Sequence, residues 1–271
     1  MMRGTRVLAA WVWLGLSLAG CTSTVTNTVV PVSDVPKDRM TASDQPESNR
    51  RASVRLQLAS AYFSDGQLTT ALDEVKQAIN ADPKMAEAYN LRGLIYAGMG
   101  DDALAEDSFR RALQLSPRDG DVMHNYGWFL CLQKRFGEAE AQFQQALAQP
   151  QYRDVTRTLL AQGVCEARAG QLAEAERTLQ RAYALDSANT AIALNLSEVL
   201  FQRGEYERAR FYIRRVNAAP QQSTPQSLWL AARIEYRSGN QPAARELGTQ
   251  LQTRFPKSPE ALAFQQGRLN D

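Results

Sequence analysis

Histidine is almost absent from this sequence. Of the 271 residues only His124 is a histidine, and cysteine occurs three times. Serine and cysteine nucleophiles are usually activated by a histidine, and most catalytic zinc sites use several histidine ligands. The chain therefore has little material for either kind of centre. We expect no enzymatic activity, no catalytic residue, no metal site, no cofactor and no small-molecule substrate.

An excess of positive charge is also missing. The chain has 31 basic and 29 acidic residues, and no dense block of lysine and arginine occurs along it. Because nucleic-acid binding needs a basic surface that neutralises several phosphates, we expect no nucleic-acid partner. With 44% apolar and 22% charged residues, the composition is that of a folded globular protein.

The chain lacks an apolar run of membrane-spanning length. Arg3 and Arg6 precede an apolar run at residues 7–19. Its roughly 13 residues fall short of the roughly 20 that a transmembrane helix needs. A basic segment, a short apolar run and small residues are typical of a cleaved secretory signal. We assign residues 1–20 to a signal peptide, with a permanent membrane span as the weaker alternative.

Cys21 directly follows Ala19 and Gly20. This order resembles the lipobox of bacterial lipoproteins, in which the cysteine is acylated and becomes the new N-terminus. An ordinary signal peptide with an accidental cysteine is the alternative. The resemblance implies a lipid anchor at Cys21, and several acyl chains make such an anchor durable. Because Thr22 rather than aspartate follows, it further implies an outer-membrane location facing the periplasm of a Gram-negative cell.

Residues 21–50 are rich in Thr, Ser, Pro, Asp and Asn, and their few apolar residues show no helical spacing. Such a composition cannot bury enough apolar surface to fold alone, so we predict a flexible tether. By square-root scaling its reach is on the order of 30 Å.

A period of about 34 residues, the length of a known class of helical repeat, organises the remaining chain. The units are 52–85, 86–119, 120–153, 156–189, 190–223 and 225–258. Position 8 of each unit is small, in Ala59, Gly93, Gly127, Gly163, Ser197 and Ala232. Position 20 is always alanine, in Ala71, Ala105, Ala139, Ala175, Ala209 and Ala244. Random apolar patterning would not keep small residues in such register, so we predict paired helices that meet closest there.

Most units also have a glycine at the turn in their middle, which Lys134 replaces in the third unit. Each has an apolar stripe in its second half, and together these features predict a helix-turn-helix. The second unit resembles the tetratricopeptide repeat (TPR) at Tyr89, Gly93, Tyr96, Gly100, Ala105, Phe109, Ala112 and Pro117. We therefore predict an all-α, right-handed superhelical solenoid of six TPR hairpins, with an ordinary helical bundle as the alternative. Gly248 replaces a bulky residue in the sixth unit and predicts loose packing there. A cap helix is predicted within 259–271.

In TPR domains, positions 2, 5, 9 and 12 of the first helices line the inner wall. This resemblance selects a candidate partner groove of Leu56, Ser60, Phe63, Asn90, Leu94, His124 and Trp128. Exposed apolar residues on such a wall commonly mark a binding surface. Leu56 and Phe63 could equally be core residues. A catalytic pair of His124 and Cys131 is the remote alternative to a contact role.

Cys131 and Cys165 occupy positions 12 and 10 of neighbouring first helices. If these helices stack side by side, the two cysteines come close enough to form a disulfide, for which the periplasm is oxidising enough. Two buried free thiols are the alternative.

The segment His124-Asn125-Tyr126-Gly127-Trp128-Phe129-Leu130-Cys131, with Pro150-Gln151-Tyr152 and Gly163-Val164-Cys165, resembles the third and fourth repeats of type IV pilus biogenesis lipoproteins of the PilF/PilW group. The resemblance implies a pilotin, which binds the pilus secretin subunit and promotes its outer-membrane localisation or multimerisation. The partner would then be a protein. The rival is a TPR lipoprotein that serves another envelope machine, such as β-barrel assembly or cell-wall synthesis.

Overall fold

The computed structural model describes residues 47–270, which lie within one compact unit, Asp44–Asp271. The predicted signal peptide 1–20, the acylation site Cys21 and the tether as far as residue 46 lie outside the described residues and stay predictions. Among the described helices, none combines the length and the apolar character that a membrane crossing requires.

All regular structure in the described residues is helical, and twelve α-helices pair into six hairpins. The hairpins are α1 (Glu47–Ser64) with α2 (Leu68–Ala81), α3 (Ala86–Met99) with α4 (Asp102–Leu115), α5 (Gly120–Leu132) with α6 (Phe136–Leu147), α7 (Val155–Arg168) with α8 (Leu172–Leu185), α9 (Thr190–Gln202) with α10 (Tyr206–Val216), and α11 (Pro225–Arg237) with α12 (Gln241–Arg254). A 3₁₀ turn, η2 (Pro220–Gln222), precedes the sixth hairpin, and α13 (Pro259–Gln265) follows it.

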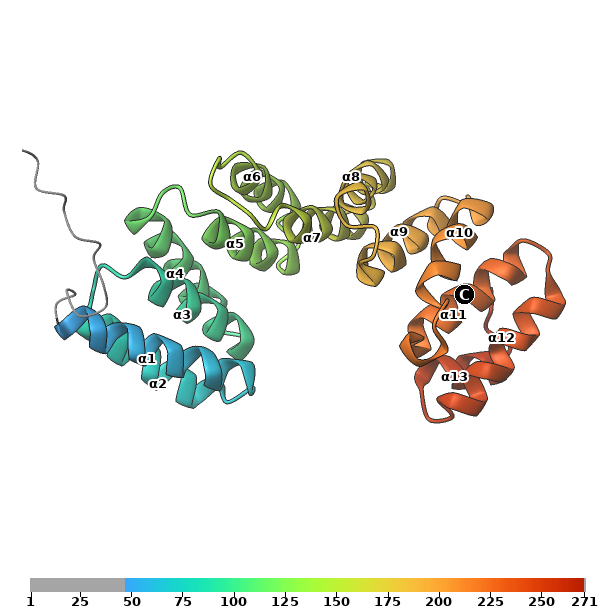
Figure 1. Cartoon of the computed structure of the whole chain (residues 1–271), viewed down its shortest axis with the longest axis horizontal. Coiled ribbons are helices and arrows are strands. Elements are labelled where there is room, and N and C mark those ends of the chain that lie inside the picture. Colours follow the sequence, from blue (N-terminus) through green and yellow to red (C-terminus); the bar gives the residue numbers. More distant parts are fainter. Residues whose placement is uncertain (1–46, 271) are drawn as a thin grey trace, which may run out of the picture. The chain divides into compact units, whose positions relative to one another are not determined.

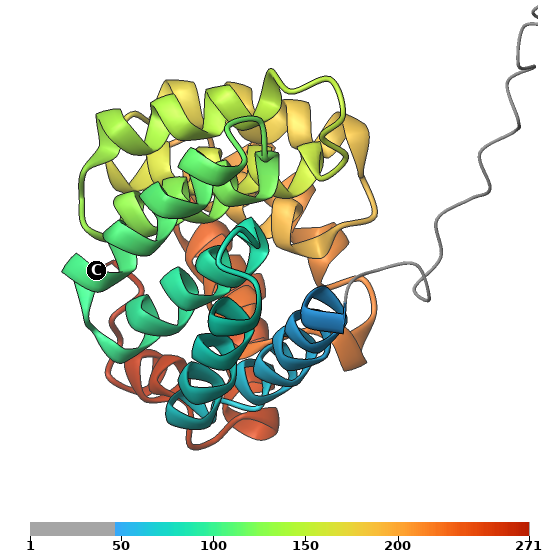
Figure 2. The same ribbon diagram turned by 90° about the vertical axis from the view of Figure 1, so that its left-hand side faces the viewer.

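The hairpins stack in chain order (Figure 1). The second helix of each hairpin packs against the first helix of the next, and neighbouring first helices such as α5 and α7 also touch. The first two hairpins, blue and teal, again lie beside one another in the view of Figure 2. The predicted all-α solenoid of TPR hairpins is therefore confirmed.

Small residues bring the two helices of each hairpin together. The alanines at position 20 have no exposed surface in any unit. At position 8, a Cβ atom added to the glycine would lie 2.8 Å from Phe109 in the second hairpin, 2.9 Å from Phe143 in the third and 2.6 Å from Leu179 in the fourth. Those three large side chains all occupy position 24. Glycine is thus the residue that lets a bulky partner fill the hairpin interior at native packing density.

Hairpin turns place one residue in the left-handed region. Glycine takes this place in five hairpins, with φ between 74° for Gly66 and 84° for Gly100. Lys134 takes it in the third, with φ 60°. Glycine adopts this conformation freely, whereas a residue with a Cβ atom pays roughly 1 kcal/mol. The third turn is therefore the strained one.

The first helix starts earlier than the predicted tether boundary at residue 50. Residues 47–50 already form the first turn of α1. Glu47 lies at the positive end of the helix dipole, and Arg51 one turn later pairs with it at 3.0 Å. These local charges favour helix where composition alone indicated a flexible segment, so the tether prediction was wrong for these residues.

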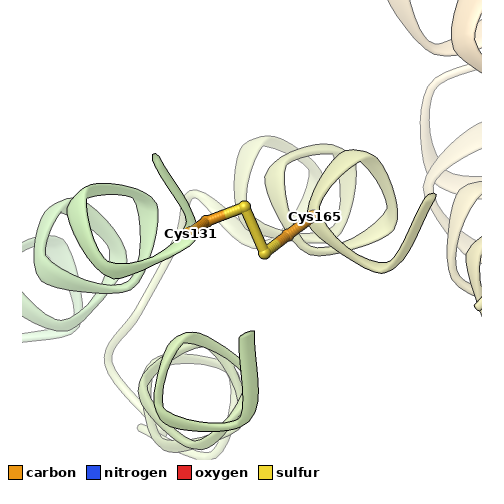
Figure 3. Close-up of a disulfide and its surroundings, with 2 residues drawn as sticks. All are labelled: Cys131 and Cys165. Atoms are coloured by element: carbon orange, nitrogen blue, oxygen red, sulfur yellow. A yellow bond between two sulfur atoms is a disulfide. The ribbon is translucent and has the colours of Figure 1, made fainter. Parts of the chain in front are cut away.

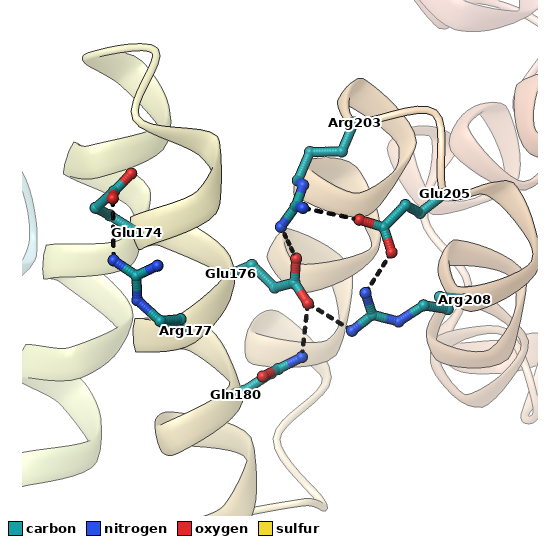
Figure 4. A network of polar contacts seen from close by, with 7 residues as sticks. All are labelled: Glu174, Glu176, Arg177, Gln180, Arg203, Glu205 and Arg208. Atoms are coloured by element: carbon teal, nitrogen blue, oxygen red, sulfur yellow. Dashed lines mark hydrogen bonds and ion pairs between the residues drawn. The ribbon is translucent and has the colours of Figure 1, made fainter.

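Glutamates at position 21 tie two pairs of hairpins together. Glu106 on α4 accepts hydrogen bonds from Arg135 of the third hairpin at 2.8 and 3.1 Å, and these bonds hold the pKa of Glu106 below its usual value. Glu176 on α8 pairs with Arg203 and Arg208 of the fifth hairpin (Figure 4). Each of these two carboxylates thus has a cation on the neighbouring hairpin.

The joint between the third and fourth hairpins lacks that arginine. Glu140, at position 21 of the third unit, meets the Gln162 amide at 2.8 Å, and the same amide donates to Glu166 at 3.0 Å. Glu166 is only 7% exposed, and its Oε2 has no hydrogen-bond partner. No ion pair among residues 47–270 involves either carboxyl. Burial raises the pKa of Glu166, and the Glu140 charge acts in the same direction, although a Thr178 hydrogen bond opposes both.

A disulfide crosses the same joint (Figure 3). It links Cys131 on α5 to Cys165 on α7, the pair predicted from the repeat register, and their Cα atoms are 5.8 Å apart. Both cysteines are buried. A covalent bond therefore holds the joint at which the carboxyl groups of Glu140 and Glu166 have no arginine partner.

The sixth hairpin is not loosely packed, so that prediction was wrong. A Cβ atom on Gly248 would lie 1.9 Å from the ring of Phe264, because this ring of the cap helix occupies the space that a bulky residue fills in other units. The cap helix itself is shorter than the predicted 259–271. It ends at Gln265, because Gly267 adopts φ 72° and the Arg268 N–H bonds back to the Ala263 carbonyl, as in a glycine C-cap.

A double-mutant cycle can test whether the Phe264 ring fills the space above Gly248. Gly248→Leu should lower the free energy of unfolding by about 2 kcal/mol, because the new side chain overlaps Phe264. Phe264→Ala should lower it by about 2 to 3 kcal/mol through the cavity it leaves. Urea unfolding of the double variant should show a loss well below the sum, since leucine then fills that cavity. Strict additivity would contradict the shared space.

Removal of the disulfide should loosen the joint between the third and fourth hairpins. For Cys131→Ser/Cys165→Ser we expect a loss of about 3 to 4 kcal/mol, the chain-entropy value for a loop of this size. Hydrogen exchange should accelerate first in α6 and α7. Dithiothreitol should produce the same change in the wild-type chain and none in the double variant; equal exchange in all samples would count against this role of the bond.

Glu166 should make stability fall as pH rises. The pKa of Glu166 is raised in the folded chain, so as pH rises the carboxyl of the unfolded chain, with its ordinary pKa of 4.5, loses its proton first. The protonated carboxyl therefore stabilises the folded chain fully below pH 4.5, and this contribution is lost as pH rises through the folded pKa. The advantage of Glu166→Gln over wild type in urea unfolding should therefore grow between pH 4.5 and neutrality. Glu246→Gln, at an exposed site on α12 away from this joint, is the control for which we expect no such growth. A pH-independent difference for Glu166→Gln would refute the explanation.

Candidate functional site

A groove of about 580 Å³ runs across the first helices of five hairpins. Because neighbouring first helices touch along the stack, side chains from α1, α3, α5, α7 and α9 face one common space. The lining residues are Phe63, Leu94, His124, Asn125, Trp128, Arg157, Leu160, Ala161, Val164 and Asn195. A second hollow of about 220 Å³ shares Val164 and Asn195 and extends the groove along α9.

Four of the seven predicted groove residues lie in this lining, namely Phe63, Leu94, His124 and Trp128. The other three do not. Leu56 packs against the core between the first two hairpins, and Ser60 is exposed with its hydroxyl bonded to the Leu56 carbonyl at 3.0 Å. Asn90 is not a lining residue, but it accepts a hydrogen bond from the lining residue Asn125 at 3.2 Å.

The apolar wall centres on Trp128 of α5 and on Leu160 and Val164 of α7. Trp128 is half-buried, and the Arg168 guanidinium lies 5.6 Å from its ring centroid. A large aromatic ring that is held in place on one side and open on the other is the kind of side chain that dominates binding energy in protein interfaces. The wall can therefore bind an apolar side chain of a partner.

A polar chain crosses the groove beside this wall. Arg157 donates to the Asn125 side-chain oxygen at 3.1 Å, and the Asn125 amide donates to Asn90. Asp121 and Asp154 lie 3.8 and 3.7 Å from Arg157 and balance its charge. The groove thus offers fixed amide groups without a strong net charge, which suits hydrogen bonding to a polypeptide backbone.

His124 is a buried neutral residue of the groove wall. Its Nδ1 lies 2.8 Å from the Thr158 hydroxyl, which is also 2.6 Å from the Tyr152 hydroxyl. Burial, reinforced by the Arg157 charge, lowers the pKa of His124 to about 4, so the ring is uncharged near neutral pH. The Cys131 sulfur belongs to the disulfide, which removes the thiol that the alternative of a His124–Cys131 catalytic pair requires. In residues 47–270, no three His, Cys, Asp or Glu side chains are grouped to hold a metal ion.

Sequence reasoning missed six lining residues. Arg157, Leu160 and Val164 occupy positions 2, 5 and 9 of the fourth unit, so the same positional rule would have found them had it been carried past the third unit. Asn125, Ala161 and Asn195 share position 6, which that rule omits. Their signal in the sequence is the repeated polar or small residue next to position 5.

Four family models match the chain. Models described as tetratricopeptide repeat match residues 84–151, 133–190 and 166–234, and one described as TPR repeat matches 59–100. The type IV pilus assembly protein PilF of Pseudomonas aeruginosa is 27% identical over 210 residues, which cover 78% of this chain and 83% of PilF.

Solved structures agree with these matches. A structure of Pseudomonas aeruginosa PilF is 25% identical, with a TM-score of 0.71, and the alignment covers 82% of this chain and all of that one. The crystal structure of PilW, described as a widely conserved type IV pilus biogenesis factor, is 31% identical with a TM-score of 0.76. That alignment covers 80% of this chain and 99% of PilW. Identity and shape agree over nearly the whole of PilW, so the chain belongs to the TPR family of type IV pilus biogenesis proteins that includes PilF and PilW.

Proposed function

We propose that this chain is an outer-membrane lipoprotein that acts as a pilotin, and that its groove binds the secretin subunit of the type IV pilus. Acyl chains on Cys21 would hold the complex at the inner leaflet of the outer membrane, where the subunit localises and multimerises. The observation that carries the proposal is the groove of α1 to α9, which combines an apolar wall with fixed amide groups in a family devoted to pilus biogenesis.

The groove suits a polypeptide better than a small molecule. Its lining is drawn from five successive hairpins, so an occupant must be long enough to meet Phe63 on α1 and Asn195 on α9. Apolar anchors on Trp128 and Leu160 would supply most of the affinity, and Asn125 would fix the backbone. No step requires a cofactor, which agrees with a role in adhesion and transport.

The lipid anchor and the groove perform separable tasks. Binding depends on side chains of α5 and α7, whereas delivery depends on Cys21, which precedes α1 in the chain. Because several acyl chains anchor a protein durably, a bound subunit would be carried wherever the lipoprotein is sorted. Loss of the anchor should therefore displace the complex from the outer membrane without dissociating it.

The test uses Trp128→Glu and Leu160→Glu, which place a charge on the apolar wall. Each should weaken binding of purified secretin subunit at least about tenfold. Trp128→Glu removes the aromatic anchor, and Leu160→Glu places a charge where an apolar side chain of the partner would bind. Cells carrying either variant should lack heat-resistant secretin multimers on immunoblots. Leu104→Glu is the matched control, because Leu104 is a half-exposed leucine on α4 outside the groove.

Cys21→Ala should keep secretin binding and displace the multimers from the outer membrane, as measured by membrane fractionation. Normal multimers and pili in a strain lacking the gene would refute the proposal. Crosslinking of the groove to a subunit of β-barrel assembly or of cell-wall synthesis would instead support service to another envelope machine.

A further inference from the structure

Phe211 is a large aromatic side chain on the outer surface of α10, and it is 55% exposed. It stands at position 22 of its unit. The other units place Asp73, Asp107, Ala141, Arg177 and Glu246 there, and all five are exposed. This position faces solvent throughout the array, so packing within the solenoid does not account for a phenylalanine. An exposed aromatic residue at a solvent position indicates a contact with another molecule.

Aromatic rings hold Phe211 in a defined place. The rings of Phe211 and Tyr212 meet edge to face with centroids 5.1 Å apart, and Tyr212 meets Tyr183 of α8 in the same way at 5.1 Å. The Arg215 guanidinium lies 5.1 Å from the Phe211 ring centroid and also donates to the Tyr183 hydroxyl. We call Tyr183, Phe211, Tyr212, Arg214 and Arg215 the α10 patch. Because these side chains restrain one another, they lose little conformational entropy when a partner binds.

The charge of the α10 patch is positive. Arg208 and Arg210, on the same helix, are neutralised by glutamates, since Arg208 pairs with Glu176 and Glu205 and Arg210 with Glu207 and Glu235. Arg214 is 70% exposed and reaches only Glu235, at 3.5 Å. No ion pair within residues 47–270 involves Arg215. The two arginines beside Phe211 therefore present positive charge to solvent.

We propose that the α10 patch is a second docking surface, which takes an acidic protein segment with an apolar residue next to its carboxylates. Arg215 and Arg214 would pair with the carboxylates, and the apolar side chain would lie on the Phe211 ring. Arginine and aromatic residues are the side chains enriched at the centre of protein interfaces. The charge complementarity selects an acidic occupant.

Other occupants fit less well. Two-fold contact between copies of the chain would bring two patches of the same positive charge together, which repels. Docking on a membrane surface needs several insertable apolar residues and a cluster of basic residues, and the patch has one exposed phenylalanine and two arginines.

The patch and the groove belong to different helices. The groove is lined by α1, α3, α5, α7 and α9, whereas the patch lies on the second helices α8 and α10. The chain could therefore hold two polypeptides at once. This inference does not depend on which protein occupies the groove.

A random peptide library displayed on phage provides the probe. The purified full-length chain in detergent serves as bait, and Phe211→Ser/Arg215→Ala serves for counter-selection. We expect enriched peptides that combine acidic and apolar residues. Either single substitution should weaken them at least about tenfold. Trp128→Glu in the groove and Leu185→Ser, an equally exposed leucine of α8, should leave their binding unchanged.

Four outcomes would overturn the proposal. The selection could fail to enrich any peptide whose binding Phe211→Ser weakens, or it could enrich peptides without acidic residues. The chain could also bind phosphatidylglycerol vesicles, or associate with itself, in a way that Phe211→Ser abolishes. Because Phe211 is exposed, its serine variant should melt at the wild-type temperature, so loss of peptide binding would report the contact and not the fold.

Discussion

Close approach of two helices within each hairpin is the constraint on which the rest of this structure depends. Alanine at position 20 and a small residue at position 8 leave no room for further atoms, as the contact of Gly127 with Phe143 shows. Because one hairpin cannot bury its apolar stripe alone, the second helix must pack against the next first helix. The stacking in turn brings the first helices together, and their free side chains form the groove.

The joints between hairpins use different chemistry for the same purpose. Glu106 and Glu176 occupy the same position of the repeat and meet arginines of the next hairpin, so their charges are paired. Glu140 has the same place but accepts hydrogen bonds from the Gln162 and Gln144 amides instead of from an arginine. A buried carboxyl without a cation is unfavourable, and Glu166, beside the half-buried Glu140, is such a carboxyl. The Cys131–Cys165 bond counteracts this weakness at the point where Trp128 and Val164 form the groove wall.

The repeat register predicted the hairpins and the proximity of the two cysteines, because both follow from spacing along the chain. It failed where a residue outside the repeat supplies the contact. Phe264 fills the space above Gly248 from the cap helix, and no rule of period could reveal that exchange. The register also carries no information about local charge pairs. Glu47 and Arg51 extend α1 into a segment whose composition indicated a flexible tether. The groove was half predicted, because the inner positions were followed through three units and the wall continues into the fourth.

The separation of packing positions from surface positions explains how one array can carry two binding surfaces. Positions 8, 20 and 24 are fixed by the interior, whereas positions 22 and 26 of the second helix are exposed in every unit and position 9 of the first helix is at least partly exposed. Trp128 is half-buried, so it packs against the core and also lines the groove. Phe211 stands on the outer surface at a position that packing within the array leaves open. The two residues lie on different helices, so each surface stays free while the other is occupied.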